Sequence, residues 1–329
     1  MNHSASLTPY NHCIRYYQQW LARCSNLSGK LLSYPPPRGP NPMIHSTAIV
    51  SDKAHIGADV EIGPFSTVED DVVLGDRTKL AGHVTIKSGT TLGTDNTVCE
   101  GAVLGGFAQH ANRPPQSGRV VIGSRNTFRE HSTVHRAIHA DQTTTIGDDC
   151  LLMVGAHVAH DCRVGNRVIL TNGVMLGGHV EVGDRACLGG NAAVHQHCRI
   201  GRLAMVGGCT KVVQDLPPFV LTDGATALIV GLNKVGLQRA GFTREEVLEL
   251  KAAYRLIYRE GLTFREMVAA LEKRFPTGVA GEFAEFFRTG TRGFVQERRS
   301  PPKIALRVHP AVDEEEAEKP ESKTLPYAA

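Results

Sequence analysis

A period of six residues constrains this 329-residue chain more than any other feature of its sequence. Counted in steps of six from Ile44 to Val212, 25 of the 29 positions hold Ile, Leu or Val, and glycine often follows directly, as in Ile62-Gly63. This period fits neither a helix at 3.6 residues nor a simple alternating strand. It is typical of a parallel β-helix, where each hexapeptide forms one flat side and glycine relieves the turn at the corner.

Three such sides close one coil, so residues eighteen apart stack and the aliphatic residues form ladders inside a prism. We therefore predict an all-β solenoid, a left-handed parallel β-helix of hexapeptide repeats, over residues 43–215. A β-sandwich would not keep one phase over this length. Residues 105–121 lack aliphatic residues in phase and contain Pro114-Pro115. This segment is predicted to project as a loop, and projecting loops often carry function.

The period ends at Pro217-Pro218 and helical signals replace it. The segments Thr243–Glu246 and Thr263–Glu266 each have the spacing of a capping box, and "GEFAEFFRTG" has the character of a further helix. These signals predict a C-terminal helical domain over residues 216–295. Residues 296–329 are charged, contain prolines and are poor in aromatic residues, so we expect a disordered tail.

The N-terminal extension, residues 1–42, contains no Asp or Glu and includes "YPPPRGPNP". We expect it to be poorly ordered. It lacks the apolar core of a signal peptide. Two explanations stay open: translation that starts at Met43 instead of Met1, and an organellar transit peptide.

Charge and cysteine usage exclude several classes of protein. The formal net charge of +3, without a basic–aromatic cluster, gives no indication of a nucleic-acid partner. No apolar run approaches the roughly eighteen residues that a membrane span needs. The eight cysteines form no CxxC pair, which favours free thiols in a reducing compartment. We expect a cytoplasmic protein.

The segment "LLMVGAHVAHDCRVGN" places His160 on an outward-facing side of the prism, and Gly178 follows eighteen residues later, one coil on. A histidine beside an approachable backbone N–H suits acyl transfer. One group removes a proton from the nucleophile, and the other stabilises the developing oxyanion. On spacing alone, a solvated histidine on a repeat face remains the alternative, as in a catalytically silent scaffold.

A zinc enzyme is a further alternative, because gamma-type carbonic anhydrases are also left-handed β-helices and bind zinc through three histidines across a subunit interface. Their motif includes two histidines five residues apart. No two of the fifteen histidines in this chain have that spacing. His157 and His160 do not form the helical HExxH motif either, because the glutamate is missing. We predict no metal.

Six segments closely resemble the UDP-N-acetylglucosamine O-acyltransferases that begin lipid A synthesis. They are "GAHVAHDC", "AVHQHC", "MVGGCTKVVQDLPPFV", "GLQRAGFTREE", "AYRLIYREG" and "FFRTGTRG". The resemblance covers roughly residues 44–294, in the same order. The related N-acyltransferases of this pathway carry a uridine-binding domain before their repeats, and too few residues precede the repeats here.

The resemblance implies a role for several residues. His160 matches the general base that deprotonates the sugar 3-hydroxyl, and the N–H of Gly178 matches the oxyanion donor. Asp161 matches the carboxylate that orients the base, although neighbouring strand residues would point to opposite faces. Residues that match the acyl and sugar sites are His157, His179, His195 and Gln196. Asn233 and Arg239 match polar groups near the nucleotide and its phosphates.

The chain departs from the family pattern at four positions. His110 and Asn112 stand in the projecting loop where an acidic residue and a lysine are usual. Val235 replaces a common glutamate, and Ala240 replaces a second arginine. The transfer machinery is therefore expected to be intact, while the acceptor is UDP-N-acetylglucosamine or a related UDP-amino sugar.

The resemblance also implies a homotrimer and an acyl carrier protein whose phosphopantetheine delivers a 3-hydroxyacyl chain, with no other cofactor. Gly208 matches a position that acts as an acyl-length ruler, and Gly207 is the better candidate for the turn residue of that hexapeptide. Lys251, Arg255 and Arg259 recur every four residues, so they form a basic stripe on one helix. We expect this stripe to dock the acidic carrier protein.

Overall fold

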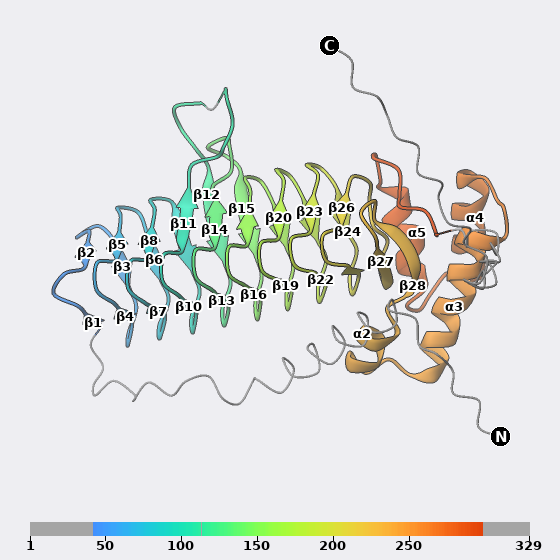
Figure 1. The fold of residues 1–329 in the computed structure, drawn as a ribbon, viewed down its shortest axis with the longest axis horizontal. Coiled ribbons are helices and arrows are strands. Elements are labelled where there is room, and N and C mark those ends of the chain that lie inside the picture. The colour runs from blue at the N-terminus through green and yellow to red at the C-terminus, as the bar shows by residue number, and fades with distance from the viewer. Residues whose placement is uncertain (1–41, 113, 299–329) are drawn as a thin grey trace, which may run out of the picture.

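A computed structural model describes residues 42–112 and 114–298, which form a long three-sided prism with a cluster of helices at its C-terminal end (Figure 1). The predicted left-handed β-helix followed by helices is confirmed. Each coil contributes one short strand to each of three sheets. Except for one hairpin at the end, every strand pair is parallel.

The three sheets are named sheet A, sheet B and sheet C in the order in which the chain visits them. Sheet A contains β1 (Met43–Ile44), β4 (Glu61–Ile62), β7 (Lys79–Leu80), β10 (Thr97–Val98), β13 (Thr127–Phe128), β16 (Leu151–Leu152), β19 (Ile169–Leu170), β22 (Cys187–Leu188), β25 (Met205–Val206), β27 (Val220–Asp223) and β28 (Leu228–Leu232). Sheet B contains β2 (Ile49–Val50), β5 (Thr67–Val68), β8 (Thr85–Ile86), β11 (Val103–Gly106), β14 (Thr133–His135), β17 (His157–Val158), β20 (Met175–Leu176), β23 (Ala193–Val194) and β26 (Lys211–Val212). Sheet C contains β3 (His55–Ile56), β6 (Val73–Leu74), β9 (Thr90–Leu92), β12 (Arg119–Ile122), β15 (Thr143–Ile146), β18 (Arg163–Val164), β21 (Glu181–Val182) and β24 (Arg199–Ile200).

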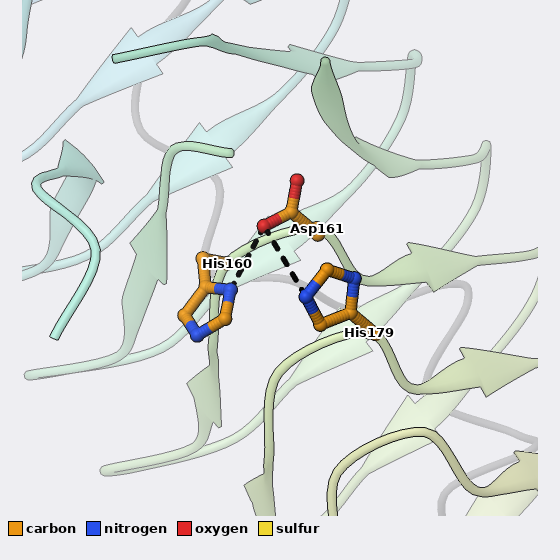
Figure 2. A group of neighbouring side chains, drawn as sticks. All are labelled: His160, Asp161 and His179. Carbon is orange, nitrogen blue, oxygen red and sulfur yellow. Dashed lines mark hydrogen bonds and ion pairs between the residues drawn. The ribbon is translucent and has the colours of Figure 1, made fainter. Parts of the chain in front are cut away.

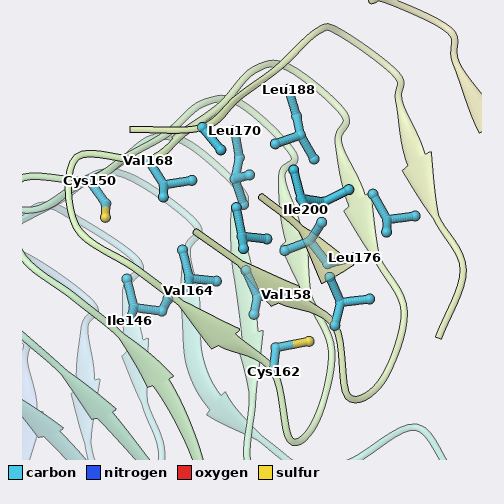
Figure 3. Packing of buried hydrophobic residues seen from close by; sticks show 14 of the residues in the cluster. Ile146, Cys150, Val158, Cys162, Val164, Val168, Leu170, Leu176, Leu188 and Ile200 are labelled. Atoms are coloured by element: carbon cyan, nitrogen blue, oxygen red, sulfur yellow. The ribbon is translucent and has the colours of Figure 1, made fainter. Parts of the chain in front are cut away.

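The aliphatic residues of the six-residue period fill the prism (Figure 3). Leu152, Leu170 and Leu188 stack on successive coils through the pairing of β16, β19 and β22, and all three are fully buried. The residue two places before each aliphatic residue of the period is also buried in most coils, for example Val60 before Ile62. Each buried aliphatic side chain stabilises the fold by about 1.5 to 3 kcal/mol relative to an exposed one. The ladders therefore fix which residues face in and which face out.

The glycine after each aliphatic residue has a different role from the predicted one. Gly63 does not have a positive φ; a Cβ on it would lie 2.7 Å from the backbone carbonyl carbon of Ala81 on the next coil. Glycine is therefore required by the close approach of coils. The left-handed turn positions are held mostly by other residues, such as Phe65 at φ 57° and Asp71 at φ 54°.

Two insertions leave the prism at the same corner, between sheet B and sheet C. The first runs from the end of β11 to the start of β12, so the projecting loop is residues 107–118 and not 105–121. The second, residues 136–142, is absent from the sequence prediction. It adds six residues to its coil, so Thr133 pairs with His157 although they are 24 residues apart. An insertion of one hexapeptide keeps the phase of the repeat and is therefore invisible to a count in sixes.

The sheet continues beyond the predicted domain boundary at residue 216. β27 stacks on β25, and β28 returns antiparallel to β27, so strand structure extends to Leu232. The helices among the described residues are α2 (Lys234–Arg239), α3 (Arg244–Arg259), α4 (Phe264–Arg274) and α5 (Gly281–Arg288). Both predicted capping boxes are present, at the start of α3 and of α4.

Ion pairs and aromatic contacts attach the helices to the last coils. Arg199 of β24 binds the carboxylate of Asp215 and donates to the carbonyl oxygen of Phe286 in α5 at 2.8 Å. Phe219 packs edge-on against Phe283 of α5, with ring centroids 5.6 Å apart. Among the described residues, no helix is long and apolar enough to cross a membrane.

The segment predicted as a disordered tail starts with residues that contact the rest of the protein. Glu297 bridges to Ile229 of β28 and accepts a hydrogen bond from the hydroxyl of Tyr254 at 2.8 Å. Residues 296–298 are thus packed onto the domain. The rest of the expected tail, and the expected N-terminal extension up to residue 41, lie outside the described residues.

Candidate active site

The predicted base lies in a turn at the corner between sheet B and sheet C, not in a strand. His160 and Asp161 form the two-residue turn after β17, and Asp161 has φ 59°. This geometry brings both side chains to the same side. Nδ1 of His160 lies 2.8 Å from Oδ2 of Asp161 (Figure 2). The expectation that neighbouring residues point to opposite faces does not hold here, because it applies to strands.

The second insertion holds the carboxylate of Asp161 in place. Oδ2 accepts a hydrogen bond from the backbone N–H of Ile138 at 3.2 Å, and the N–H of Asp161 donates to the hydroxyl of Thr144 at 2.8 Å. The Asp161 side chain is only 6% exposed. A fixed carboxylate favours the tautomer of His160 with its proton on Nδ1, which leaves a lone pair on Nε2.

Gly178 lies beside the ring of His160, as the stacking of coils predicts. A Cβ on Gly178 would overlap the imidazole of His160, so no larger residue fits without displacing the base. Within the described ranges, the N–H of Gly178 donates no hydrogen bond to the protein. The base and a free backbone N–H are therefore neighbours. His160 itself is largely buried, at 8% exposure, although it lies outside the prism core.

Further histidine rings surround the base. The ring of His179 is edge-on to His160, at 5.3 Å between centroids, and it stacks on His197 at 4.5 Å. Its Nε2 lies 3.9 Å from Oδ2 of Asp161. Burial lowers the pKa of His179, and the neighbouring histidines act in the same direction against the opposing effect of Asp161. His179 is therefore mainly neutral near pH 7.

His157 belongs to the site together with two residues that the sequence analysis missed. Nδ1 of His157 lies 2.8 Å from the hydroxyl of Thr133, and its ring is edge-on to His135 at 4.9 Å. Burial, with the charges of His157 and His160, lowers the pKa of His135 to about 4. Burial also lowers the pKa of His157. A count of eighteen residues back from His157 predicts residue 139 as its neighbour on the previous coil. Because of the second insertion, Thr133 is the neighbour instead.

The turn after β23 lies at the same corner between sheet B and sheet C, one coil further along the prism. Gln196 is the first turn residue after β23, one coil on from Gly178, and it is exposed together with His195. Nδ1 of His195 lies 3.1 Å from the carbonyl oxygen of Gln196. His197, which stacks on His179, follows the eighteen-residue rule and could have been found from the sequence.

Asn233 and Arg239 do not join this corner within one chain. Asn233 caps α2: its side chain accepts from the N–H of Gly236 at 2.9 Å and donates to the carbonyl oxygen of Leu203 at 2.8 Å. Leu203 lies in a turn between sheet C and sheet A, a different corner of the prism. Arg239 is the last residue of α2. Val235 lies in the first turn of the same helix, and Ala240 is its C-cap.

Gly208 lies at the third corner, between sheet A and sheet B. It is the first residue of the turn after β25, so the assignment of the turn role to Gly207 is wrong. A Cβ on Gly207 would lie 3.0 Å from the carbonyl oxygen of Thr222, whereas a Cβ on Gly208 would lie 3.3 Å from that of Gly190. Gly190 occupies the same turn position one coil earlier, so neither of these two stacked positions carries a side chain.

The predicted basic stripe lies on α3, but its three members are not equivalent. Lys251 is half-buried and Arg255 is exposed. Arg259 donates to the carboxylate of Glu297 at 2.9 Å, and this hydrogen bond raises the pKa of its guanidinium. Only the first two cations are therefore offered to a partner.

The corner between sheet B and sheet C also contains a group of side chains that could hold a metal ion. One ligand atom from each of His160, Asp161 and His179 lies within 4.8 Å of the others. In the structure, the Nδ1 of His160 that faces this group is hydrogen-bonded to Asp161. This arrangement fits a carboxylate-oriented base, because His160 Nε2 faces away from Asp161 (Figure 2).

A β-helix of hexapeptide repeats with a histidine–carboxylate pair beside a free glycine N–H defines a hexapeptide-repeat acyltransferase. The family model for bacterial transferase hexapeptide repeats matches residues 53–88 and 143–178. The model for domain 2 of UDP-N-acetylglucosamine O-acyltransferase matches residues 215–295.

Solved structures give the same result. LpxA from Acinetobacter baumannii is 35% identical over 77% of this chain and 100% of that chain, with a TM-score of 0.75. The UDP-N-acetylglucosamine acyltransferase of Francisella novicida is 34% identical over 81% and 99%, with a TM-score of 0.75. That of Arabidopsis is 31% identical over 78% and 100%, with a TM-score of 0.69. The chain belongs to the UDP-N-acetylglucosamine O-acyltransferases, the family that initiates lipid A synthesis.

Proposed function

We propose that this protein transfers a 3-hydroxyacyl chain from acyl carrier protein to the 3-hydroxyl of UDP-N-acetylglucosamine or a related UDP-amino sugar. The observation that carries the proposal is the His160–Asp161 pair beside the N–H of Gly178. Phosphopantetheine on the carrier protein supplies the thioester, and no other cofactor is required. The six described cysteines are free thiols, which supports a reducing, cytoplasmic setting.

The geometry supports a general-base mechanism. Nε2 of His160 takes the proton of the 3-hydroxyl as the sugar oxygen attacks the thioester carbonyl. The N–H of Gly178 stabilises the negative charge on the carbonyl oxygen, and Asp161 stabilises the imidazolium that forms. When the intermediate collapses, the carbon–sulfur bond breaks and His160 returns the proton to the thiolate. His157, His179, His195 and Gln196 line the space for the acyl and sugar groups.

The outer faces of the sheets support a homotrimer with sites between neighbouring prisms. The outward residues of sheet A in its C-terminal half are apolar and half-buried: Leu151, Ile169, Cys187 and Met205. Sheet B presents Met175, at 51% exposure, and Ala193. Sheet C presents charged side chains at the same level: Arg163, Glu181 and Arg199. Sheet A of one copy therefore suits sheet B of the next.

This packing would complete the site. If the corner between sheets A and B lies on a threefold axis, sheet A of one copy covers sheet B of its neighbour. The far edges of these two faces then meet, which places Asn233 and Arg239 of one copy beside His160 of the next. Residues that lie at different corners of one chain would thus share one site, where Arg239 is placed to bind phosphate. The acyl chain would lie between the apolar faces and point toward Gly208.

The decisive experiment compares wild type with His160→Ala in an assay that offers acyl-carrier-protein donors and a panel of UDP-sugars. Loss of a general base lowers kcat by about 10² to 10⁴. The thermal unfolding midpoint should change little, because His160 lies outside the prism core. His55→Ala is the matched control, since His55 is an exposed histidine on β3, far along the prism from this corner.

Three outcomes would contradict parts of this proposal. Near-wild-type turnover by His160→Ala would remove His160 as the base. A wild-type protein that acylates no sugar would support the catalytically silent scaffold. Metal analysis of the same purified protein tests the zinc alternative: stoichiometric zinc that is lost in both His160→Ala and His179→Ala would favour a gamma-type zinc enzyme.

A further inference from the structure

The first insertion brings another histidine over the base. The ring of His110, on loop 107–118, is edge-on to the ring of His160, with centroids 6.1 Å apart and an interplanar angle of 87°. The His110 side chain is exposed, so it borders the open side of the site.

The loop backbone determines what His110 offers to a ligand. The N–H of Asn112 donates to Nδ1 of His110 at 3.2 Å, and the N–H of His110 donates to the carbonyl oxygen of Ala108 at 3.0 Å. The lone pair on Nδ1 is therefore used. In neutral imidazole the proton then lies on Nε2, so His110 presents a hydrogen-bond donor and no acceptor.

The acceptor sugar has a group that matches this donor. The 3-hydroxyl that His160 deprotonates has a hydroxyl on the adjacent ring carbon, and that oxygen carries lone pairs. Two hydroxyls on adjacent carbons lie about 3 Å apart, close to a hydrogen-bond length. The centroids of the two imidazoles are 6.1 Å apart, a separation at which neighbouring hydroxyls of one sugar ring can each reach a different ring.

We propose that His110 is a specificity-determining residue that donates its Nε2–H to the hydroxyl adjacent to the reacting one. This inference rests on the proposed acyl transfer and deepens it by assigning recognition of the sugar stereochemistry. His110 positions the acceptor and takes no part in proton transfer. A sugar in which that hydroxyl is inverted, as in UDP-N-acetylgalactosamine, directs its oxygen away from His110 and loses the hydrogen bond.

The test measures kcat and KM for UDP-N-acetylglucosamine and UDP-N-acetylgalactosamine with wild type, His110→Ala and His110→Gln. A neutral hydrogen bond contributes enough to change binding by roughly two- to tenfold. His110→Ala should raise the KM for UDP-N-acetylglucosamine by about that factor, leave kcat nearly unchanged and reduce the preference over the epimer. His110→Gln keeps an N–H donor and should recover part of the preference. Gln116→Ala, an exposed change on the same loop, should match wild type.

The outcomes separate this inference from the proposed function. Transfer by wild type with an unchanged KM and epimer preference in His110→Ala would overturn the role of His110 alone. A lower kcat at unchanged KM would also overturn it, because His110 would then act on the base. Absence of transfer by wild type with either sugar would overturn the proposed function itself.

Discussion

The pairing of His160 with Asp161 shows how one residue in a left-handed turn changes the chemistry of its neighbour. In a strand the two side chains would diverge. Asp161 at φ 59° reverses the chain, and its carboxylate reaches Nδ1 of His160. Aspartate is among the residues that adopt this conformation most readily. The same residue therefore forms the turn and contacts the proposed base.

At the residue scale, Gly208→Met tests the acyl-length ruler. Neither Gly208 nor Gly190 carries a side chain at this corner, so wild type should accept chains of about fourteen carbons, and methionine should shift preference toward about ten carbons. Each buried methylene contributes about 0.8 kcal/mol, so a four-carbon difference gives strong selectivity. The measurement is kcat/KM across a series of acyl-carrier-protein donors.

Gly82→Met is the matched control for this change. Gly82 holds the same turn position several coils earlier, and a Cβ there would lie 3.3 Å from the carbonyl oxygen of Pro64, as crowded as at Gly208. Gly82→Met therefore measures how much a methionine side chain at this turn position destabilises the protein, at a site far from the proposed acyl-binding region near Gly208. An unchanged chain-length profile in Gly208→Met, or a wild type that already prefers ten-carbon donors, would remove the ruler.

At the scale of elements, the two insertions build the site and the prism supplies its frame. Residues 136–142 hold the carboxylate of Asp161 through the N–H of Ile138, and residues 107–118 bring His110 to the base. Both leave from the corner that carries His160. Insertions are tolerated at corners because the inward ladders and the pairing of strands continue past them, as the unbroken pairing of β9, β12 and β15 shows.

The basic stripe of α3 gives a prediction at this scale. Reversal of Lys251 and Arg255 to glutamate should raise the KM for acyl carrier protein, most strongly at low salt, because surface charges steer association and salt screens them. Arg259 is left unchanged, since Glu297 already binds it. The double change Arg265→Glu with Lys273→Glu on α4 has the same charge and is the control. Equal KM values for both double variants and wild type would leave the stripe as a solvated face.

At the scale of the whole molecule, we expect a trimer of about threefold the chain mass in light scattering at micromolar concentration. The apolar outer residues of sheet A, together with Met175 and Ala193 of sheet B, would supply the interface, and closed threefold packing would bury both faces on every copy. A stable monomer that retains full activity would contradict this arrangement.

Complementation tests whether neighbouring copies share sites. His160→Ala and Arg239→Ala should each be nearly inactive alone. Mixed trimers would contain sites in which an intact His160 meets an intact Arg239 from the next copy, so co-expression should restore part of the activity. If mixed trimers form without recovery, both residues act in one chain and the proposed packing is wrong.

The sequence by itself determined the prism, the helical domain and the position of the proposed base. A buried ladder needs one aliphatic residue every six positions, so the repeat records the coil geometry directly, and eighteen-residue stacking placed Gly178 beside His160. Local signals were equally direct at the capping boxes of α3 and α4. These features depend on contacts at fixed separations along the chain.

Only the tertiary structure decided the rest of the site. Thr133 and His135 approach His157 because residues 136–142 shift the stacking, and an insertion of one hexapeptide leaves no trace in the phase. His110 reaches the base from a loop that has no period. Asn233 and Arg239 lie at another corner, so their place in a site depends on a second copy of the chain. Contacts between segments at variable separations carry no periodic signal, and the folded chain alone fixes them.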